Sequence, residues 1–154
     1  KLNNLQSAPV TTVYLKYAEK VSIPQRFIGV YDGYFNWFFD RRYCNQKNLI
    51  AGTSFISPEI FATEGTTPAE KCQQELSRIF PKWPKPVDSI TISEPDAKLC
   101  CSVSSNVNRP GYHTGLPNCY LAGDYTDTGL PGTIESAIKS GIKCAEQIIQ
   151  SRKK

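Results

Sequence analysis

The alternation of apolar and polar residues over residues 10–17 predicts a β-strand. Val13 and Leu15 fall on one side of this strand, and Tyr14 and Lys16 fall on the other, because successive side chains of a strand point to opposite faces of its sheet. The pattern does not say which face is buried. Tertiary contacts must decide between the two.

A β-hairpin is predicted at residues 27–41. Residues 27–31 and 34–41 are rich in aromatic side chains, which are favoured in strands. Asp32-Gly33 between them is a dipeptide typical of two-residue hairpin turns. Residues 49–57 are interpreted as a fourth strand, so the first part of the chain is expected to form an antiparallel meander.

One helix is predicted in the middle of the chain, at residues 67–80. Thr67 and Glu70 have the spacing of a capping box, and Pro68 stands at the first helical position, where its missing N–H costs nothing. Before this helix, residues 57–65 are expected to form a loop or a short helical turn. After it, closely spaced prolines exclude helical structure up to residue 86, and residues 87–93 and 98–104 are interpreted as two further strands.

The stretch from residue 118 to residue 141 reads NCYLAGDYTDTGLPGTIESAIKSG. Its short apolar run at 119–122 predicts a buried strand that Gly123 and Asp124 bring to an end. A loop with two glycines follows, and Pro131 suggests the first turn of a helix. From Ile134 onward, apolar residues recur with a period near 3.6, which predicts an amphipathic helix.

A strand, a glycine turn and a helix start in this order can hold a ligand that carries negative charge. We expect the backbone N–H groups of Gly132, Thr133 and Ile134 to point out of the helix start, where the helix dipole adds about half a positive charge. Asp124 can accept a hydrogen bond from a sugar-like hydroxyl, since an ionised carboxylate only accepts. The spacing alone is equally consistent with an ordinary strand-to-helix connection in an α/β domain.

The residues of this stretch resemble a known signature. LAGDYTDTGLPGTIESAIKSG is similar to the C-terminal flavin-binding signature of the flavin-containing amine oxidase superfamily, and most resembles that of the squalene-associated FAD-dependent desaturases, or hydroxysqualene dehydroxylases. In that group the pattern is LAGD, then W or Y, then TxTGLPATIEGAxxSG. This chain departs from the pattern at Gly132, where the pattern has alanine, and at Ser136, where it has glycine. Residues 11–15, 36–41 and 108–110 resemble the TTVYL, QWLFDR and RP segments of the same group.

The resemblance implies a fold of the α+β or α/β class. Residues 1–105 would form part of a substrate domain, an antiparallel or mixed sheet with one helix. Residues 106–154 would supply the C-terminal strand, turn and helix of a two-part FAD-binding domain. FAD is the implied cofactor, and its implied binding residues are Gly123, Asp124, Gly132, Thr133 and Ile134.

The resemblance also implies the chemistry. Hydride would pass between the flavin and a long isoprenoid, either in the dehydroxylation of hydroxysqualene or in the desaturation of a polyene, and no residue identifies itself as a catalytic base. Two alternatives stay open, a carotenoid desaturase or amine oxidase, and a non-catalytic remnant. The remnant is an alternative because the fingerprint GxGxxG, which holds a dinucleotide pyrophosphate, is absent from the 154 residues.

Methionine is also absent from the sequence. We therefore expect a fragment that is inactive by itself and whose N-terminal dinucleotide-binding segment is supplied elsewhere. That segment is the expected polypeptide partner, and a lipophilic isoprenoid is the expected small-molecule partner.

Composition argues against several other partners. The 18 basic and 14 acidic residues give a net charge of +4, and the basic residues at the two chain ends account for this surplus, so a nucleic-acid partner is not expected. No apolar run approaches the roughly 20 residues needed to cross a bilayer, while a peripheral membrane contact stays open.

The six cysteines lack zinc-ligand spacing and there is one histidine, so no metal site is expected. Reduced thiols are expected, in a protein that is cytoplasmic or peripheral to the inner membrane face.

Three further features each have a functional and a structural interpretation. Asp40 and Arg41 either orient a polar group of a substrate or form a surface ion pair. His113 either acts as an acid or base near the predicted ligand site or is a solvated loop residue. An aromatic strip is either the wall of a lipophilic substrate tunnel or, more commonly for strand aromatics, hairpin core; it comprises Tyr31, Tyr34, Trp37, Phe38 and Phe39.

Overall fold

The computed structural model of this chain describes residues 2–151. These residues divide into two compact units. One unit, here called the sheet unit, holds residues 9–97, and the other, here called the helical unit, holds the described residues of 1–8 and 98–154.

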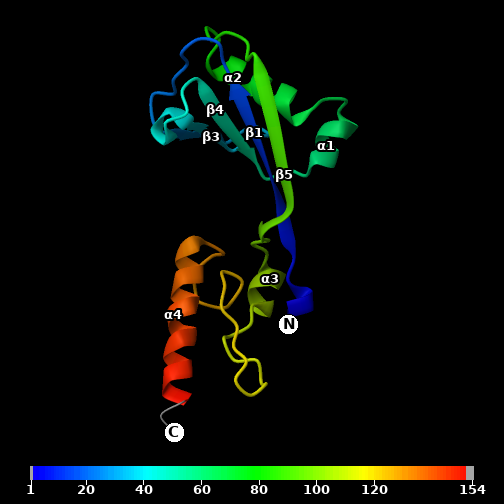
Figure 1. The fold of residues 1–154 in the computed structure, drawn as a ribbon. Coiled ribbons are helices and arrows are strands. Elements are labelled where there is room, and N and C mark those ends of the chain that lie inside the picture. The colour runs from blue at the N-terminus through cyan, green and yellow to red at the C-terminus, as the bar shows by residue number, and fades with distance from the viewer. Residues whose placement is uncertain (1, 152–154) are drawn as a thin grey trace. The chain divides into compact units, whose positions relative to one another are not determined.

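The sheet unit is built on a five-stranded sheet with the strand order β2-β3-β4-β1-β5. The β2–β3, β3–β4 and β1–β4 pairs are antiparallel, and α1 (Pro58–Thr63) and α2 (Pro68–Ile79) lie beside the sheet (Figure 1). This confirms the predicted middle helix and the antiparallel run β2-β3-β4 of the predicted meander. The expected place of the first strand is wrong, because β1 pairs with β4 and not with β2. The strands are β1 (Ser7–Lys16), β2 (Phe27–Gly29), β3 (Trp37–Asp40), β4 (Leu49–Ser54) and β5 (Asp88–Leu99).

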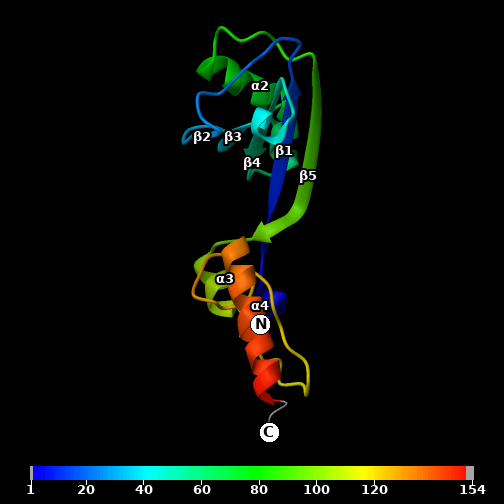
Figure 2. The ribbon, with the colours of Figure 1, turned by 60° about the vertical axis from the view of Figure 1, so that its left-hand side comes forward.

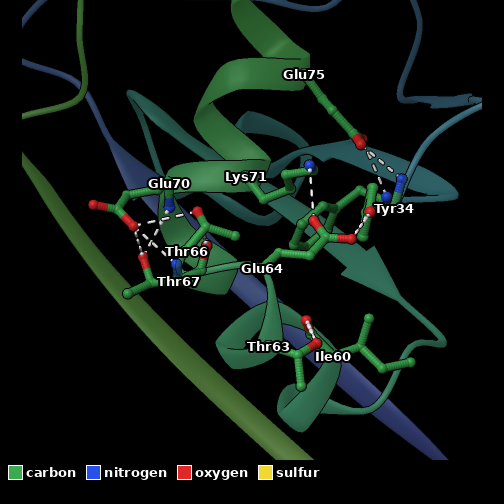
Figure 3. Close-up of polar contacts among 10 residues, drawn as sticks. Tyr34, Ile60, Thr63, Glu64, Thr66, Thr67, Glu70, Lys71 and Glu75 are labelled. Carbon is green, nitrogen blue, oxygen red and sulfur yellow. Dashed lines mark hydrogen bonds and ion pairs between the residues drawn. The ribbon is translucent and has the colours of Figure 1, made fainter.

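The capping box at the start of α2 is confirmed. The Thr67 hydroxyl accepts a hydrogen bond from the Glu70 backbone N–H at 3.2 Å, and the Glu70 carboxylate accepts one from the Thr67 N–H at 2.8 Å (Figure 3). Two N–H groups that the helix cannot satisfy are therefore paired reciprocally. Pro68 occupies the first turn, as predicted.

The core of the sheet unit lies between α2 and one face of the sheet. Val13 and Leu15 are buried there, so tertiary contacts bury this side of β1. Gly52 lets α2 approach β4 closely, because a Cβ at Gly52 would lie 2.6 Å from Cys72 Sγ. The buried core comprises Val13, Leu15, Tyr17, Val21, Ile23, Phe35, Phe38, Ile50, Phe61, Cys72 and Leu76.

The hairpin is confirmed, but the predicted two-residue turn is wrong. Residues 30–36 join β2 to β3, and Gly33 does not adopt the left-handed conformation that such a turn requires. The reason lies in Glu75 of α2, whose nearly buried carboxylate accepts hydrogen bonds from the N–H groups of Tyr34 at 2.6 Å and Phe35 at 3.1 Å (Figure 3). These bonds hold a wider loop against the helix.

The second of the two strands predicted after α2 is wrong. β5 is one strand that runs to Leu99, and residues 103–108 form the helix α3 (Val103–Asn108). Ser102 caps this helix, since its hydroxyl accepts a hydrogen bond from the Ser105 N–H at 3.0 Å. This cap satisfies the Ser105 N–H locally, so the segment can form a helix and needs no neighbouring strand to accept that hydrogen bond.

Buried Asp40 forms an ion pair with partly exposed Arg42, so the predicted surface pair with Arg41 is wrong. The Asp40 side chain is fully buried. Its carboxylate lies 2.7 Å from the Arg42 guanidinium and accepts further hydrogen bonds from the backbone N–H groups of Arg42 and Ile23, each at 3.0 Å. Arg41 instead donates to the Gln46 side chain at 2.8 Å.

This pairing makes the sheet unit sensitive to acid. Burial alone would raise the pKa of Asp40, but the hydrogen bonds from Arg42 and Ile23 outweigh it and hold the pKa below its ordinary value. Such a carboxyl group stabilises the fold above its ordinary pKa and loses that contribution as the pH falls through the lowered value. We expect Asp40→Asn to lower the free energy of unfolding at neutral pH by about 1–3 kcal/mol, because a buried hydrogen-bonded charge is lost.

Urea denaturation at several pH values tests this prediction. The wild-type chain should lose stability below about pH 4, the ordinary pKa of an aspartate, and Asp40→Asn should lose less over the same interval. Asp88→Asn, at an exposed position of the same unit, should keep the wild-type profile. Parallel profiles for wild type and Asp40→Asn would contradict the assignment.

The helical unit contains α3 and α4 (Ile134–Ser151), joined by a long loop (Figure 2). The helix predicted from residue 134 is confirmed. The buried strand predicted at 119–122 is wrong: the run forms a single bridge, between Tyr120 and His113, and Cys119 is exposed. A strand persists only where neighbouring strands take up its N–H and C=O groups, and within residues 2–151 this run meets no other strand residue.

Within residues 2–151, no helix is long and apolar enough to cross a membrane. The same residues hold no cluster of three or more His, Cys, Asp or Glu side chains suited to a metal ion. The six cysteines are all free thiols.

Candidate functional site

The signature loop turns sharply at a glycine. Gly123 has a φ of +154°, and a Cβ at this position would lie 2.4 Å from the Tyr125 ring. Only glycine fits there without a shift of the ring or the backbone. The next residue, Asp124, is thereby placed at the start of the loop that leads to α4.

Two buried serines of α4 hold this loop. Ser140 Oγ accepts hydrogen bonds from the Gly123 N–H at 3.1 Å and from the Thr126 hydroxyl at 2.6 Å. One turn earlier, Ser136 Oγ lies 2.6 Å from Thr128 Oγ1. Ser136 and Ser140 are four residues apart and so lie on one face of the helix. The loop is thus attached to α4 at two levels.

The side of α4 that faces this loop is polar rather than apolar. Ser136 and Ser140 are the buried residues of the helix, whereas its isoleucine stripe is exposed within the described residues. Ile134 is 82% exposed, and three further isoleucines along the same side are more than half exposed, namely Ile138, Ile142 and Ile149. The predicted apolar stripe is therefore present, and it is left open on the surface of the helical unit.

The helix begins later than Pro131 suggested. α4 starts at Ile134, with Thr133 as its cap: the Thr133 carbonyl accepts from the Ala137 N–H at 3.0 Å, and its hydroxyl accepts from the Ser136 N–H at 3.3 Å. The placement of Pro131 in the first helical turn is wrong, because Thr133 supplies the cap two residues further on.

Three amides at the helix start are free to bind a ligand. Within residues 2–151, the N–H groups of Gly132, Thr133 and Ile134 donate no hydrogen bond. The carboxylate of half-buried Asp124 likewise accepts none from the described residues. A Cβ at Gly132 would lie 3.2 Å from Asp124 Oδ2, so the free amides and the free carboxylate are close neighbours.

A groove of about 500 Å³ opens beside Gly132, the first of these groups. The glycine-rich segment 129–132 lines it together with Leu99, Val103 and Val107. The site thus combines unpaired backbone donors and an acceptor-only carboxylate with apolar lining residues. Such a site suits a ligand that has one apolar part and one polar part.

Arg109 is a member of this site that the sequence did not single out as functional. It is 6% exposed, and its guanidinium donates hydrogen bonds to the backbone carbonyls of Leu130 and Asp124 and to Ser136 Oγ. The only sequence signal for it was its place in the RP segment. Sequence reasoning also gave no role to Ser140, whose partners become visible only once the loop is folded.

His113 lies away from the helix start. Its ring centroid is 5.7 Å from that of Tyr120, and the Tyr120 hydroxyl is within 3.3 Å of the hydroxyl of Ser151, the last residue of α4. An 18-residue helix is roughly 27 Å long. The prediction that His113 lies near the ligand site is therefore wrong.

The aromatic strip divides between core and surface. Phe38 is fully buried, as the core interpretation predicts, whereas Tyr31 is fully exposed. Trp37 and Phe39 point to the other face of β3 and are 39% and 36% exposed. Together with Phe27, whose ring centroid lies 5.7 Å from that of Trp37, they form an exposed aromatic face of the sheet unit.

Comparison with known proteins decides the family. The model of the family described as flavin containing amine oxidoreductase matches residues 1–149. The chain belongs to this family. Membership implies a flavin cofactor, and the site fits one, since it offers free amide donors and a free carboxylate beside an apolar groove.

Three curated relatives of this chain are named hydroxysqualene dehydroxylase. The one from Rhodopseudomonas palustris is 28% identical over 141 residues, which are 91% of this chain and 32% of the relative. That from Zymomonas mobilis is 29% identical over 125 residues, 77% of this chain and 28% of the relative. The one from Sinorhizobium fredii is 44% identical over 55 residues, 36% of this chain and 13% of the relative. This chain spans about a third of the length of the first two.

A solved structure has the same fold. A protein from Exiguobacterium described as a protoporphyrinogen oxidase superposes with a TM-score of 0.65 at 15% sequence identity. The match covers 96% of this chain and 36% of that protein. At this identity the likeness concerns the fold alone.

Proposed function

We propose that this chain supplies the flavin-contacting part of an FAD-dependent oxidoreductase that acts on a long isoprenoid. The reaction would be removal of an allylic hydroxyl or desaturation of a polyene. The observation that carries the proposal is the group of free amides at Gly132, Thr133 and Ile134 beside the unpaired carboxylate of Asp124. The name shared by the curated relatives supports the substrate class.

Each part of the site has a task in this proposal. Bound FAD would supply hydride acceptance and donation. The amides of Thr133 and Ile134 would donate hydrogen bonds to the electron-rich edge of the flavin ring, where the start of an 18-residue helix favours negative charge. Asp124 would accept a hydrogen bond from a hydroxyl of the ribityl chain. Gly123 and Gly132 would allow the backbone to approach the cofactor closely.

The sheet unit offers a surface for an apolar substrate. Phe27, Trp37 and Phe39 present an exposed aromatic face, and exposed aromatic clusters of this kind commonly mark contact sites for apolar ligands. We propose that this face contacts the hydrocarbon chain. The buried part of the strip, represented by Phe38, would serve stability instead.

A second polypeptide segment completes the proposed holoenzyme. The pyrophosphate-binding glycine fingerprint is not among the 154 residues, and the relatives are about three times as long as the matched region. The exposed isoleucines of α4, Ile138 and Ile142 among them, give such a segment an apolar surface to cover. We propose that tight FAD binding requires it.

Reconstitution tests the function. The gene product that carries this chain should purify with a flavin absorbance band and convert hydroxysqualene or a related polyene, as followed by mass spectrometry. Conversion of an amine but not of the isoprenoid would refute the substrate class. A gene product that binds no FAD at saturating concentration would refute the cofactor assignment.

A further inference from the structure

We propose that Arg109 is a positioning residue that fixes Asp124 beside the start of α4. Its hydrogen bonds to Leu130, Asp124 and Ser136 are here called the brace, and Ser136 is its side-chain member. The inference rests on the proposed function, because it assigns to Arg109 a role in preparing the FAD site. Arg109 itself donates hydrogen bonds to two backbone carbonyls and a serine hydroxyl, and not to the Asp124 carboxylate.

The guanidinium joins three points that are distant along the chain. Nη2 donates to the Asp124 carbonyl at 2.7 Å and to Ser136 Oγ at 3.3 Å, while Nη1 donates to the Leu130 carbonyl. Both ends of the segment 124–130 and the first turn of α4 are thereby attached to one rigid planar group. Lysine cannot reproduce this arrangement, because its ammonium is a point charge on a flexible stem.

The surroundings of Arg109 are not those that stability alone would favour. The side chain is nearly buried, yet within residues 2–151 it has no carboxylate partner at ion-pair distance, and its Nε has no hydrogen-bond partner. A buried guanidinium without a counter-charge is costly, and unsatisfied buried donors are rare. Strained or incompletely satisfied groups of this kind concentrate where geometry serves a site.

Ser136 adds side-chain contacts to the brace. The related pattern has glycine at this position, whereas here the hydroxyl lies 2.6 Å from Thr128 Oγ1 and 3.3 Å from Arg109 Nη2. Ser136 therefore links Arg109 to the middle of the loop. Glycine at 136 would remove both contacts and leave the guanidinium with its two carbonyl partners.

The hydrogen bond from Arg109 restricts where the Asp124 side chain can lie. Its own backbone carbonyl is fixed by Arg109, and its carboxylate stands 3.2 Å from the Cβ position of Gly132. A carboxylate fixed beside the free amides before the ligand arrives loses less freedom on binding. Arg109 and Asp124 should therefore contribute to affinity as a coupled pair.

A double-mutant cycle on FAD affinity tests this coupling in the gene product that carries the chain. Arg109→Lys should weaken FAD binding roughly tenfold in the native background, the effect of one lost charge-assisted hydrogen bond, but less than about threefold in the Asp124→Ala background. A purely structural Arg109 would give the same factor in both backgrounds, and that result would overturn the proposal. Arg78→Lys is the matched control, since Arg78 also donates to a backbone carbonyl, that of Asp32 at 3.0 Å, but in the sheet unit.

Hydrogen–deuterium exchange of the 154-residue chain tests the brace without any cofactor. Arg109→Lys and Ser136→Gly should each raise the exchange of the hydrogen-bonded amides within residues 123–130 by at least about tenfold and leave residues 142–151 unchanged. Ser136→Ala keeps helix propensity while removing the hydroxyl and should resemble Ser136→Gly in the loop. Unchanged exchange in the loop would refute the brace, whereas failure of the wild type to bind FAD would refute only the proposed function.

Discussion

Replacing Phe38 with alanine is expected to lower the free energy of unfolding of the sheet unit by about 3–5 kcal/mol, the usual cost of deleting a fully buried phenylalanine. Phe38 is 0% exposed and its ring stacks on that of Phe35 at a centroid distance of 6.1 Å. Gly52 and α2 enclose it closely, with Phe38 Cε1 only 2.9 Å from the Cβ position of Gly52. Such a site has little freedom to collapse around a cavity.

Phe39→Ala is the matched control for this prediction. Phe39 is the next residue of the same strand but lies on the opposite, exposed face. Its truncation should cost about 1 kcal/mol or less. Urea denaturation monitored by circular dichroism measures both variants, and equal losses in the two proteins would mean that the assignment of faces in β3 is wrong.

The second large effect concerns ligand affinity: Asp124→Ala should weaken FAD binding by roughly 10- to 100-fold, or about 1.5–3 kcal/mol, the value of a hydrogen bond to a charged group. The carboxylate has no partner among the described residues, so its removal leaves no group of the protein unsatisfied. The loss should therefore appear in affinity and not in stability. Fluorescence titration of FAD measures the first, and thermal unfolding measures the second.

Asp127→Ala provides the comparison within the same loop. Asp127 is exposed, accepts one hydrogen bond from the Gly129 N–H at 3.3 Å, and falls at the variable position of the related pattern. Its truncation should change FAD affinity by less than about twofold, within the usual range of surface substitutions. Equal losses for Asp124→Ala and Asp127→Ala would indicate a general charge effect in place of a specific contact.

The parts of the fold that could be predicted from sequence are those fixed by local chemistry. The capping box of Thr67 and Glu70 set the start of α2, and the alternation of Val13 with Tyr14 predicted the strand β1, although not which of its faces is buried. Both signals act over a few residues, so no tertiary information was needed. The same applies to α4. The spacing of its apolar residues predicted a helix, but it did not predict what the helix packs against.

The parts that could not be predicted depend on partners far along the chain. The loop of residues 30–36 is held by Glu75, about 40 positions away, and no local pattern encodes that contact. The run at 119–122 has strand composition but meets no neighbouring strand within the described residues, so its apolar character misled the prediction. Asp40 found its partner in Arg42 because of a 3₁₀ turn at Arg41–Cys44 that its own carboxylate caps.

The candidate site shows the same division. Gly123, Asp124 and the helix-start amides could be proposed from the motif, because backbone donors at a helix start follow from helix geometry. Arg109 and Ser140 could not, since their roles depend on carbonyls and hydroxyls that only the folded loop brings to them. Ser136 was visible in the sequence only as a departure from a related pattern.

The central claim is that the amides at the start of α4 bind the flavin of FAD, and ¹⁵N-resolved NMR of the gene product during FAD titration tests it most directly. Residues Gly132, Thr133 and Ile134 should show the largest amide shifts, and residues 142–151 should show almost none. Saturable FAD binding that leaves these three amides unmoved would contradict the account.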